Sequence, residues 1–392
     1  MRRVVAFVVL GFSLAPAQAP DPRERARAWS LWREINKHAW DAREVVPVWQ
    51  VWCGPDEGLI YRNAAALDDT RCTKEFIYAA GLNLRKSSQL PEEAGDIWSR
   101  AVSVHMNPEL LERLLDYRGE AQDQPEAWLI QSPLTEPYAQ NATQSHLLYP
   151  FGKEAPPVYS FARTVKNRVP IAVKAAWQVF DPSEVCRDPS SAKVPYYDPA
   201  HAPAGYAPYP PSAWPDARFV DLSSARLPCR GYQPPAGAIP LSRFYHFRVR
   251  VQAGALKPGG IAVLTGLHVA TRETEDWIWS TFYWHPEPDK GFGADRPADV
   301  PAPWNQYVMQ TTKKQGEIVF NPYLEAGMKN GRISNCMSCH RMAALGRRMA
   351  PAEHCVAIIP DNAPSFRRDK SVLTDYLWSL TKGAKPWSCS DF

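Results

Sequence analysis

The sequence has no apolar run that is long enough to cross a bilayer as a permanent helix. Its most hydrophobic stretch, Val4 to Leu14, is shorter than the roughly 20 residues that a transmembrane helix needs. The chain also has little excess charge, because 45 Lys and Arg against 41 Asp and Glu leave a net charge of +4, and no basic stripe alternates with aromatic residues. We therefore expect no stable membrane span and no nucleic-acid partner.

The amino terminus has the pattern of an export signal. Arg2 and Arg3 precede the apolar run, and Ala17-Gln18-Ala19 provides the small residues of a signal-peptidase site. These features predict a signal peptide over residues 1–19 and a mature protein in the periplasm. Pro20 follows the site directly and disfavours cleavage, so an uncleaved anchor is the alternative.

The stretch with the most specific chemistry is Cys336-Met337-Ser338-Cys339-His340. Two thiols separated by two residues can bond to the two vinyl groups of one haem, and the adjacent imidazole is then an axial ligand of its iron. A redox Cys-x-x-Cys pair and half a zinc site are the alternatives. The chain has no second Cys-x-x-Cys for zinc, and the trailing His disfavours thioredoxin chemistry. The motif predicts one covalent haem c held by Cys336, Cys339 and His340.

The other cysteines agree with export. Eight cysteines are present, so six remain when the haem pair is set aside, an even number in an oxidising compartment. Reactive thiols are the alternative for all six. Proximity along the chain suggests three disulfides: Cys53–Cys72, Cys186–Cys229 and Cys355–Cys389.

Composition and periodicity favour a chain that is mainly β. With 38 Pro and 15 Trp we expect irregular connections, short strands and few helices. Apolar residues at helical spacing predict helices at 21–40, 74–84, after 107–108 and at 371–380. Alternating or continuous apolar runs predict strands at 46–51, 101–106, 169–180, 244–251, 260–270 and 277–284.

Two parts of the sequence resemble known groups of proteins. The haem motif together with the stretch Leu373 to Leu380, which contains Tyr-Leu-x-x-Leu, resembles the end of a small c-type cytochrome. The stretches Trp277 to Phe282 and Asn321 to His340 resemble exported bacterial monohaem proteins that have no assigned activity. The resemblance implies a haem and a sandwich-like sheet, and it implies no particular reaction.

We therefore expect an α+β fold that is mainly β, with an antiparallel β-sandwich-like core and a small C-terminal helical cytochrome c-like haem region. Proline-rich residues 196–215 should form a surface loop strapped by the middle disulfide. The expected divisions are a signal peptide at 1–19, a mixed helix and strand region at 20–155, the sandwich-like region at 156–300 and the haem region at 301–392.

The sequence does not decide which residue is the second axial ligand of the iron. Met342 and Met349 follow the motif too closely in sequence to reach the opposite face of the haem. His268 lies in an apolar strand where a buried imidazole needs a partner, so it is the first candidate, followed by His354 and then Met309. A hydrogen-bonded core histidine is the alternative for His268, and an open iron position is a further possibility.

The presence or absence of this second ligand distinguishes electron transfer from enzyme or sensor functions. Two firm ligands predict electron transfer with a redox partner protein or a small-molecule donor or acceptor. An open position predicts a peroxidase-like haem enzyme or a gas or redox sensor. The Trp residues alone would suggest a binding module, although core packing is the simpler interpretation. The acids Glu273, Glu275 and Asp276 are interpreted as a charged turn.

Overall fold

The computed structural model describes a part of the chain that is mainly β and antiparallel, with few helices, as predicted. Several predicted features lie outside the described residues: the signal peptide, the helices at 74–84 and 371–380, and the disulfides Cys53–Cys72 and Cys355–Cys389. The described residues are 21–40, 45–52, 100–107, 109–110, 169–205, 207–249, 258–273, 277–314, 317–328, 330–340, 347–348 and 385–386.

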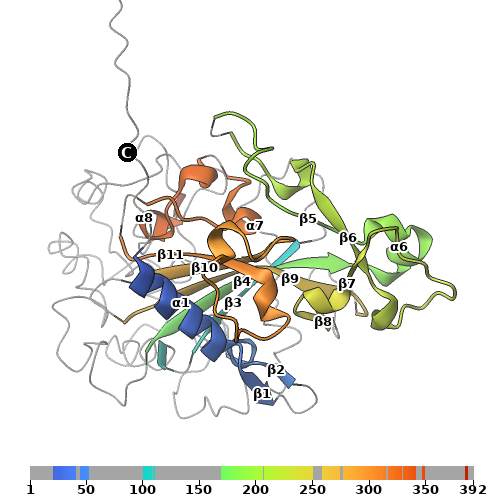
Figure 1. The fold of residues 1–392 in the computed structure, drawn as a ribbon, viewed down its shortest axis with the longest axis horizontal. Coiled ribbons are helices and arrows are strands. Elements are labelled where there is room, and N and C mark those ends of the chain that lie inside the picture. The colour runs from blue at the N-terminus through green and yellow to red at the C-terminus, as the bar shows by residue number, and fades with distance from the viewer. Residues whose placement is uncertain are drawn as a thin grey trace, which may run out of the picture.

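The largest element is a six-stranded sheet with the order β11-β10-β9-β4-β3, in which β8 also pairs with β9 (Figure 1). Every strand pairing in this sheet is antiparallel. The strands are β3 (Arg100–Met106), β4 (Ile171–Phe180), β8 (His246–Arg248), β9 (Ile261–Thr271), β10 (Ile278–Trp284) and β11 (Tyr307–Thr312).

Strand β9 is the centre of this sheet. β4 pairs with it along its length, while β8 and β10 share its other edge, β8 at Ile261 to Val263 and β10 from Gly266 to Thr271. Every residue of β9 is buried. Because both of its faces are covered, its sequence is a continuous apolar run instead of an alternation.

One face of the sheet is covered by α1 (Pro22–Ile35), and we call it the α1 face. Asp21 caps this helix and Pro22 occupies its first position, as helix starts favour. The ring of Trp32 stacks on Phe282 of β10 with centroids 4.1 Å apart, and its Nε1 donates to the carbonyl of Trp304 at 3.1 Å. The predicted helix is therefore confirmed as far as Ile35.

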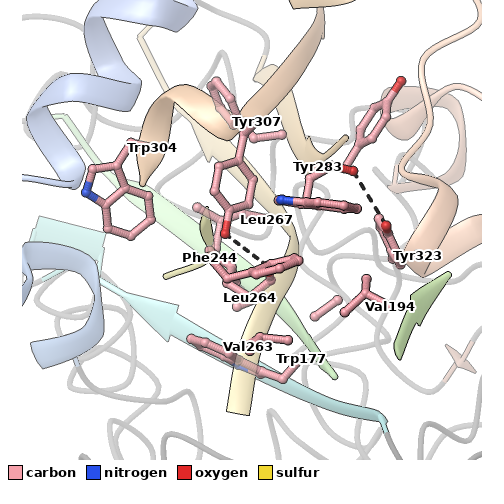
Figure 2. Close-up of a cluster of buried hydrophobic side chains, with 14 of the residues drawn as sticks. Trp177, Val194, Phe244, Val263, Leu264, Leu267, Tyr283, Trp304, Tyr307 and Tyr323 are labelled. Carbon is pink, nitrogen blue, oxygen red and sulfur yellow. Dashed lines mark hydrogen bonds between the residues drawn. The ribbon is translucent and has the colours of Figure 1, made fainter. Parts of the chain in front are cut away.

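A cluster of aromatic and aliphatic side chains fills the core around β9 (Figure 2). Tyr307 of β11 lies within it and donates its hydroxyl to the carbonyl of Leu264 at 2.9 Å. Burial raises the pKa of this hydroxyl, which therefore stays protonated as a donor. The Trp, Tyr and Phe side chains of the strands therefore pack mainly in the core, as their strand pattern indicates.

A small three-stranded sheet stands beside the large one and is braced by a disulfide. Cys186 and Cys229 form this bond, as predicted, and Cys186 belongs to a short helix. These elements are α6 (Pro182–Arg187), β5 (Lys193–Pro195), β6 (Ala217–Asp221) and β7 (Ile239–Pro240).

The predicted surface loop at 196–215 also has a packing role. Trp214 and Tyr209 are buried, and Trp214 contacts Tyr323 of α7 (Pro322–Glu325) with ring centroids 5.3 Å apart. The backbone N–H of Tyr209 donates to the carbonyl of Ala326 at 2.8 Å. This loop therefore packs against α7 and the residue that follows it.

Two predicted strands are shorter than expected. The strand at 46–51 is wrong beyond Pro47, because β1 (His38–Trp40) pairs with β2 (Val45–Pro47) and the chain then turns into η1 (Val48–Val51), which buries Trp49. The strand at 244–251 begins only at His246 in β8, because β10 takes the next part of the same β9 edge at that end; residues 250 and 251 are not among those described.

The remaining elements are short. No helix of the described residues is long and apolar enough to cross a membrane. The large sheet takes strands from all three regions expected between residues 20 and 392, so these boundaries do not separate independent sheets. The other elements are η5 (Pro189–Ser191), η6 (Pro211–Ala213), η7 (Ser223–Ala225), η8 (Leu241–Arg243), η9 (Gly291–Gly293), η10 (Trp304–Gln306), η11 (Gly331–Ile333), α8 (Cys336–His340), β12 (Arg347–Arg348) and β13 (Lys385–Pro386).

His105 of β3 makes the stability of this fold depend on pH. Its Nδ1 is 3.1 Å from the carbonyl of Trp52, and burial lowers the pKa of the ring to about 4. The unfolded chain takes up this proton near pH 6.5, so stability is lost as pH falls from about 6.5 to 4, by about 3 kcal/mol.

We expect the His105→Gln variant to lose less unfolding free energy over that pH range than the native protein. Urea denaturation at several pH values measures the difference. Equal slopes for His105→Gln and the native protein would contradict the assignment.

Candidate functional site

The predicted haem motif lies on the face of the sheet opposite to α1. Neighbouring residues on a strand point to opposite faces, so Thr281 points away from the side on which Phe282 meets α1. Helix α7, which precedes the motif, and helix α8, which is the motif itself, lie on that side (Figure 1). We call it the motif face, and its central strand residues are Lys174, Gly266, His268, Ala270, Trp279, Thr281 and Tyr283.

Asn321 anchors the motif segment to this face. Its side chain caps α7 by accepting from the N–H of Tyr323 at 3.0 Å, and its Nδ2 donates to Thr281 Oγ1 at 2.9 Å and to the carbonyl of Phe282 at 3.0 Å. A Cβ on Gly266 would lie 2.7 Å from Asn321 Oδ1. Glycine is therefore required where the amide rests on β9.

Glu325, at the end of α7, links the helix to the centre of the sheet. It accepts from the backbone N–H of Asn321, and its Oε1 is 2.6 Å from His268 Nε2. Burial by itself raises the pKa of this carboxyl, but the charge and hydrogen bond of His268, the charge of Lys174 and the N–H of Asn321 together hold it below its usual value. The group is thus an ionised carboxylate that can only accept hydrogen bonds.

The turn between α7 and α8 is compact. A Cβ on Gly331 would lie 1.8 Å from the carbonyl oxygen of Glu325, so the chain can pass there only as glycine. Asn335 is fully buried and donates to the carbonyls of Glu317 at 2.6 Å and Lys314 at 3.1 Å. These contacts fix the start of α8 against the segment that connects β11 to α7.

The motif itself forms α8, a single helical turn. Cys336 and Cys339 are three positions apart and therefore lie on one side of the helix. Cys336 is buried, with its Sγ 3.4 Å from the carbonyl of Val319, while the side chain of Cys339 is not among those described. The ring of His340 packs against Trp279 of β10 with centroids 4.1 Å apart.

Trp279 places the motif next to His268. Trp279 pairs with Ala270, and Thr281 pairs with His268, so Trp279 and His268 are diagonal neighbours on the motif face. Two polar atoms here are buried without a hydrogen-bond partner: Nδ1 of His268 and Nε1 of Trp279. Such atoms are rare in folded proteins and need an explanation.

The other residues considered as iron ligands lie away from the motif face or outside the described residues. Met309 pairs with Phe282 and is fully buried on the α1 face, so its candidacy is wrong. His354 lies outside the described residues, as do Met342 and Met349. Among the three acids, Glu273 forms an ion pair with Arg27 at 2.8 Å, in agreement with a charged turn, and residues 274–276 are not described.

The structure adds residues that the sequence did not indicate. Nothing in the sequence marks Asn321 as an anchor, because its contacts with β10 form only in the fold. Glu325 and Lys174 were missed because they meet His268 only in the fold, Glu325 from 57 residues away. A buried carboxylate and imidazole in contact can position a metal ligand or exchange a proton.

Asp198, His201 and Asp216 form a second cluster whose composition could suit a metal ion. His201 is exposed and its Nδ1 is 2.5 Å from an Asp216 oxygen, an ion pair that raises the pKa of the ring. This contact already satisfies the imidazole at the surface. We therefore assign no metal to the cluster.

No family model, curated protein or solved structure matches the chain. Any function of the motif face must therefore be argued from the residues that line it. Those residues offer a cysteine and a histidine from α8, an oriented imidazole from β9 and an indole N–H from β10.

The contact between Gly266 and Asn321 can be measured as a coupling. Gly266→Ala should destabilise the protein because the new Cβ meets the amide of Asn321. Asn321→Ala should cost about 2 kcal/mol through the lost cap and the two lost donations to β10. In the double variant the alanine at 266 no longer meets an obstacle, so we expect a favourable coupling of about 1 kcal/mol.

Denaturant titration of the four proteins gives this coupling. Asp181→Ala is the matched control, because Asp181 caps the exposed helix α6 through Ser183 N–H. Its loss should add to that of Gly266→Ala without coupling. Strict additivity of Gly266→Ala and Asn321→Ala would contradict the anchoring role of Asn321.

Proposed function

We propose that this protein is an exported c-type cytochrome, located in the periplasm, that carries one covalent haem c on the motif face and transfers electrons. Its partner would be a redox protein or a small-molecule donor or acceptor. The observation that carries the proposal is the position of the Cys-x-x-Cys-His turn over a buried, polar-lined face of the sheet.

The residues of the motif face fit such a group. A bound haem supplies reversible one-electron chemistry at its iron. Cys336 and Cys339 would hold the porphyrin through its vinyl groups, and His340 would be the proximal iron ligand. His268 offers an unpartnered ring nitrogen for a second ligand, and Trp279 offers an unpartnered N–H suited to a haem carboxylate.

The fold gives the proposed site a dry and rigid floor. The strand residues of β9 and β10 under the motif are buried, and Met337 inside the motif is 4% exposed. A low-dielectric floor with two firm ligands suits electron transfer, because little has to rearrange when the iron changes charge. We also propose that the chain after β11 forms the small helical haem region, with α7 and α8 as its first part, since β11 itself belongs to the large sheet.

One observation favours a second candidate, a peroxidase-like haem enzyme or a gas or redox sensor. Lys174 and Glu325 both act on the motif face beside His268, and together these groups could deliver or accept protons near an open iron position. This candidate needs the iron to lack a second protein ligand. The two functions therefore differ in a property that a spectrum reports.

Loss of covalent haem is the first test. The protein is produced with a haem-attachment system in the exported compartment, and haem is detected on a denaturing gel. Cys336→Ala and Cys339→Ala should each abolish or greatly reduce the stained band, while Ser338→Ala, inside the same turn, should keep it. Covalent haem that survives both cysteine changes, or stoichiometric zinc in a haem-free native protein, would overturn the proposal.

Carbon monoxide separates the two functions. The haem-loaded protein is reduced and its absorption spectrum is followed after carbon monoxide is added. A low-spin spectrum that changes slowly and little supports electron transfer, because two ligands already occupy the iron. Rapid binding to a high-spin ferrous haem would instead support the enzyme or sensor.

A further inference from the structure

His268 is held in an orientation that is typical of metal-binding histidines. Its Nε2 is 2.6 Å from Glu325 Oε1, and the side chains of the two residues are 8% and 14% exposed. Because an ionised carboxylate only accepts, the hydrogen of this bond belongs to Nε2. A histidine that binds a metal does so as the neutral ring, and in that form Nδ1 carries a lone pair.

Nothing in the described surroundings uses that lone pair. Nδ1 is buried and has no hydrogen-bond partner. On the next strand, Thr281 stands directly opposite His268, but its Oγ1 receives the amide of Asn321. A buried ring nitrogen without a partner is rare in folded proteins and calls for an explanation.

A carboxylate on one ring nitrogen and an available lone pair on the other is the arrangement that orients histidine ligands of metals. The carboxylate fixes the tautomer and the ring, and it makes the other nitrogen a stronger donor. Glu325 is itself fixed, because it also accepts from the N–H of Asn321, the anchor of the motif segment. The ligand and the motif are therefore positioned by the same short helix.

The haem motif is close enough along the sheet for this ring to serve it. Diagonal neighbours on adjacent strands are about 7–8 Å apart, and Trp279, the diagonal neighbour of His268, is the residue on which His340 packs. Both imidazoles thus lie on the motif face, His268 within β9 and His340 packed on Trp279 of β10.

We propose that Nδ1 of His268 is the second protein ligand of the haem iron, and that Glu325 is the positioning residue that holds this ligand. The assignment rests on the proposed function, since it needs the haem attached by the motif. It specifies the ligating atom, the tautomer and the supporting carboxylate, none of which could be inferred from the sequence alone. Carbon monoxide would bind the ferrous iron only after Nδ1 has left it.

The test uses the full-length, haem-loaded protein and its ferrous and ferric spectra. His268→Ala should convert a low-spin spectrum to a high-spin one and make carbon monoxide binding fast. Glu325→Ala should leave the histidine in place but weaken its bond to iron, so carbon monoxide affinity should rise about 10–100-fold. Glu325→Gln keeps the shape and an acceptor oxygen but removes the charge, so its affinity should lie between that of the native protein and that of Glu325→Ala.

Two controls separate ligation from loss of structure. Asp216→Ala breaks the exposed His201–Asp216 pair and should leave every spectrum and affinity unchanged. Circular dichroism and the amount of covalent haem show whether each variant folds. If His268→Ala fails to fold, the graded response of Glu325→Gln and Glu325→Ala still decides the question.

The outcomes also separate this assignment from the proposed function. Covalent haem with an unchanged low-spin spectrum in His268→Ala, or native carbon monoxide affinity in Glu325→Ala, would overturn the assignment and leave the cytochrome intact. A low-spin native spectrum lost in Lys174→Ala but kept in His268→Ala would make Lys174 the ligand. Absence of covalent haem from the native protein would overturn the proposed function itself.

Discussion

The placement of the haem motif depends on one buried amide. Asn321 caps α7, donates twice to β10 and rests on Gly266 of β9, so a single side chain joins the motif segment to the two central strands. α7 has only four residues and could not be stable alone, because so short a helix gains few internal hydrogen bonds. Its position is therefore set by the sheet. The compact turn at Gly331 then fixes α8 relative to α7.

The two faces of the sheet serve different purposes. The α1 face is aromatic and closely packed, with Trp32 on Phe282 and the hydroxyl of Tyr307 satisfied internally. The motif face carries charged and polar groups in positions that are nearly as buried. Hydrophobic burial on the first face stabilises the sheet, and this stability lets the second face hold groups that a core would otherwise exclude.

Sequence reasoning reached the parts of this architecture that local patterns encode. The runs at 169–180, 260–270 and 277–284 became β4, β9 and β10, because length, branching and aromatic content identify fully buried strands. Strand ends failed where two strands compete for one edge, as β8 and β10 do at β9. His268 could be named as a candidate from its position in an apolar run, but Glu325 could not, because only the fold brings the two together.

A buried carboxylate and imidazole at the centre of a sheet are difficult to explain by stability. Apolar residues of similar volume are usually neutral or stabilising in place of such a pair, since the attraction between the partners barely offsets their desolvation. Glu325 and His268 also leave one ring nitrogen unsatisfied, which adds to this cost. Coordination of Nδ1 by an iron, as proposed, would lower this cost by turning an unsatisfied atom into a ligand. The proposed ligation also implies that the sheet would be less stable without a haem than with one, because any group that binds only the folded state stabilises it.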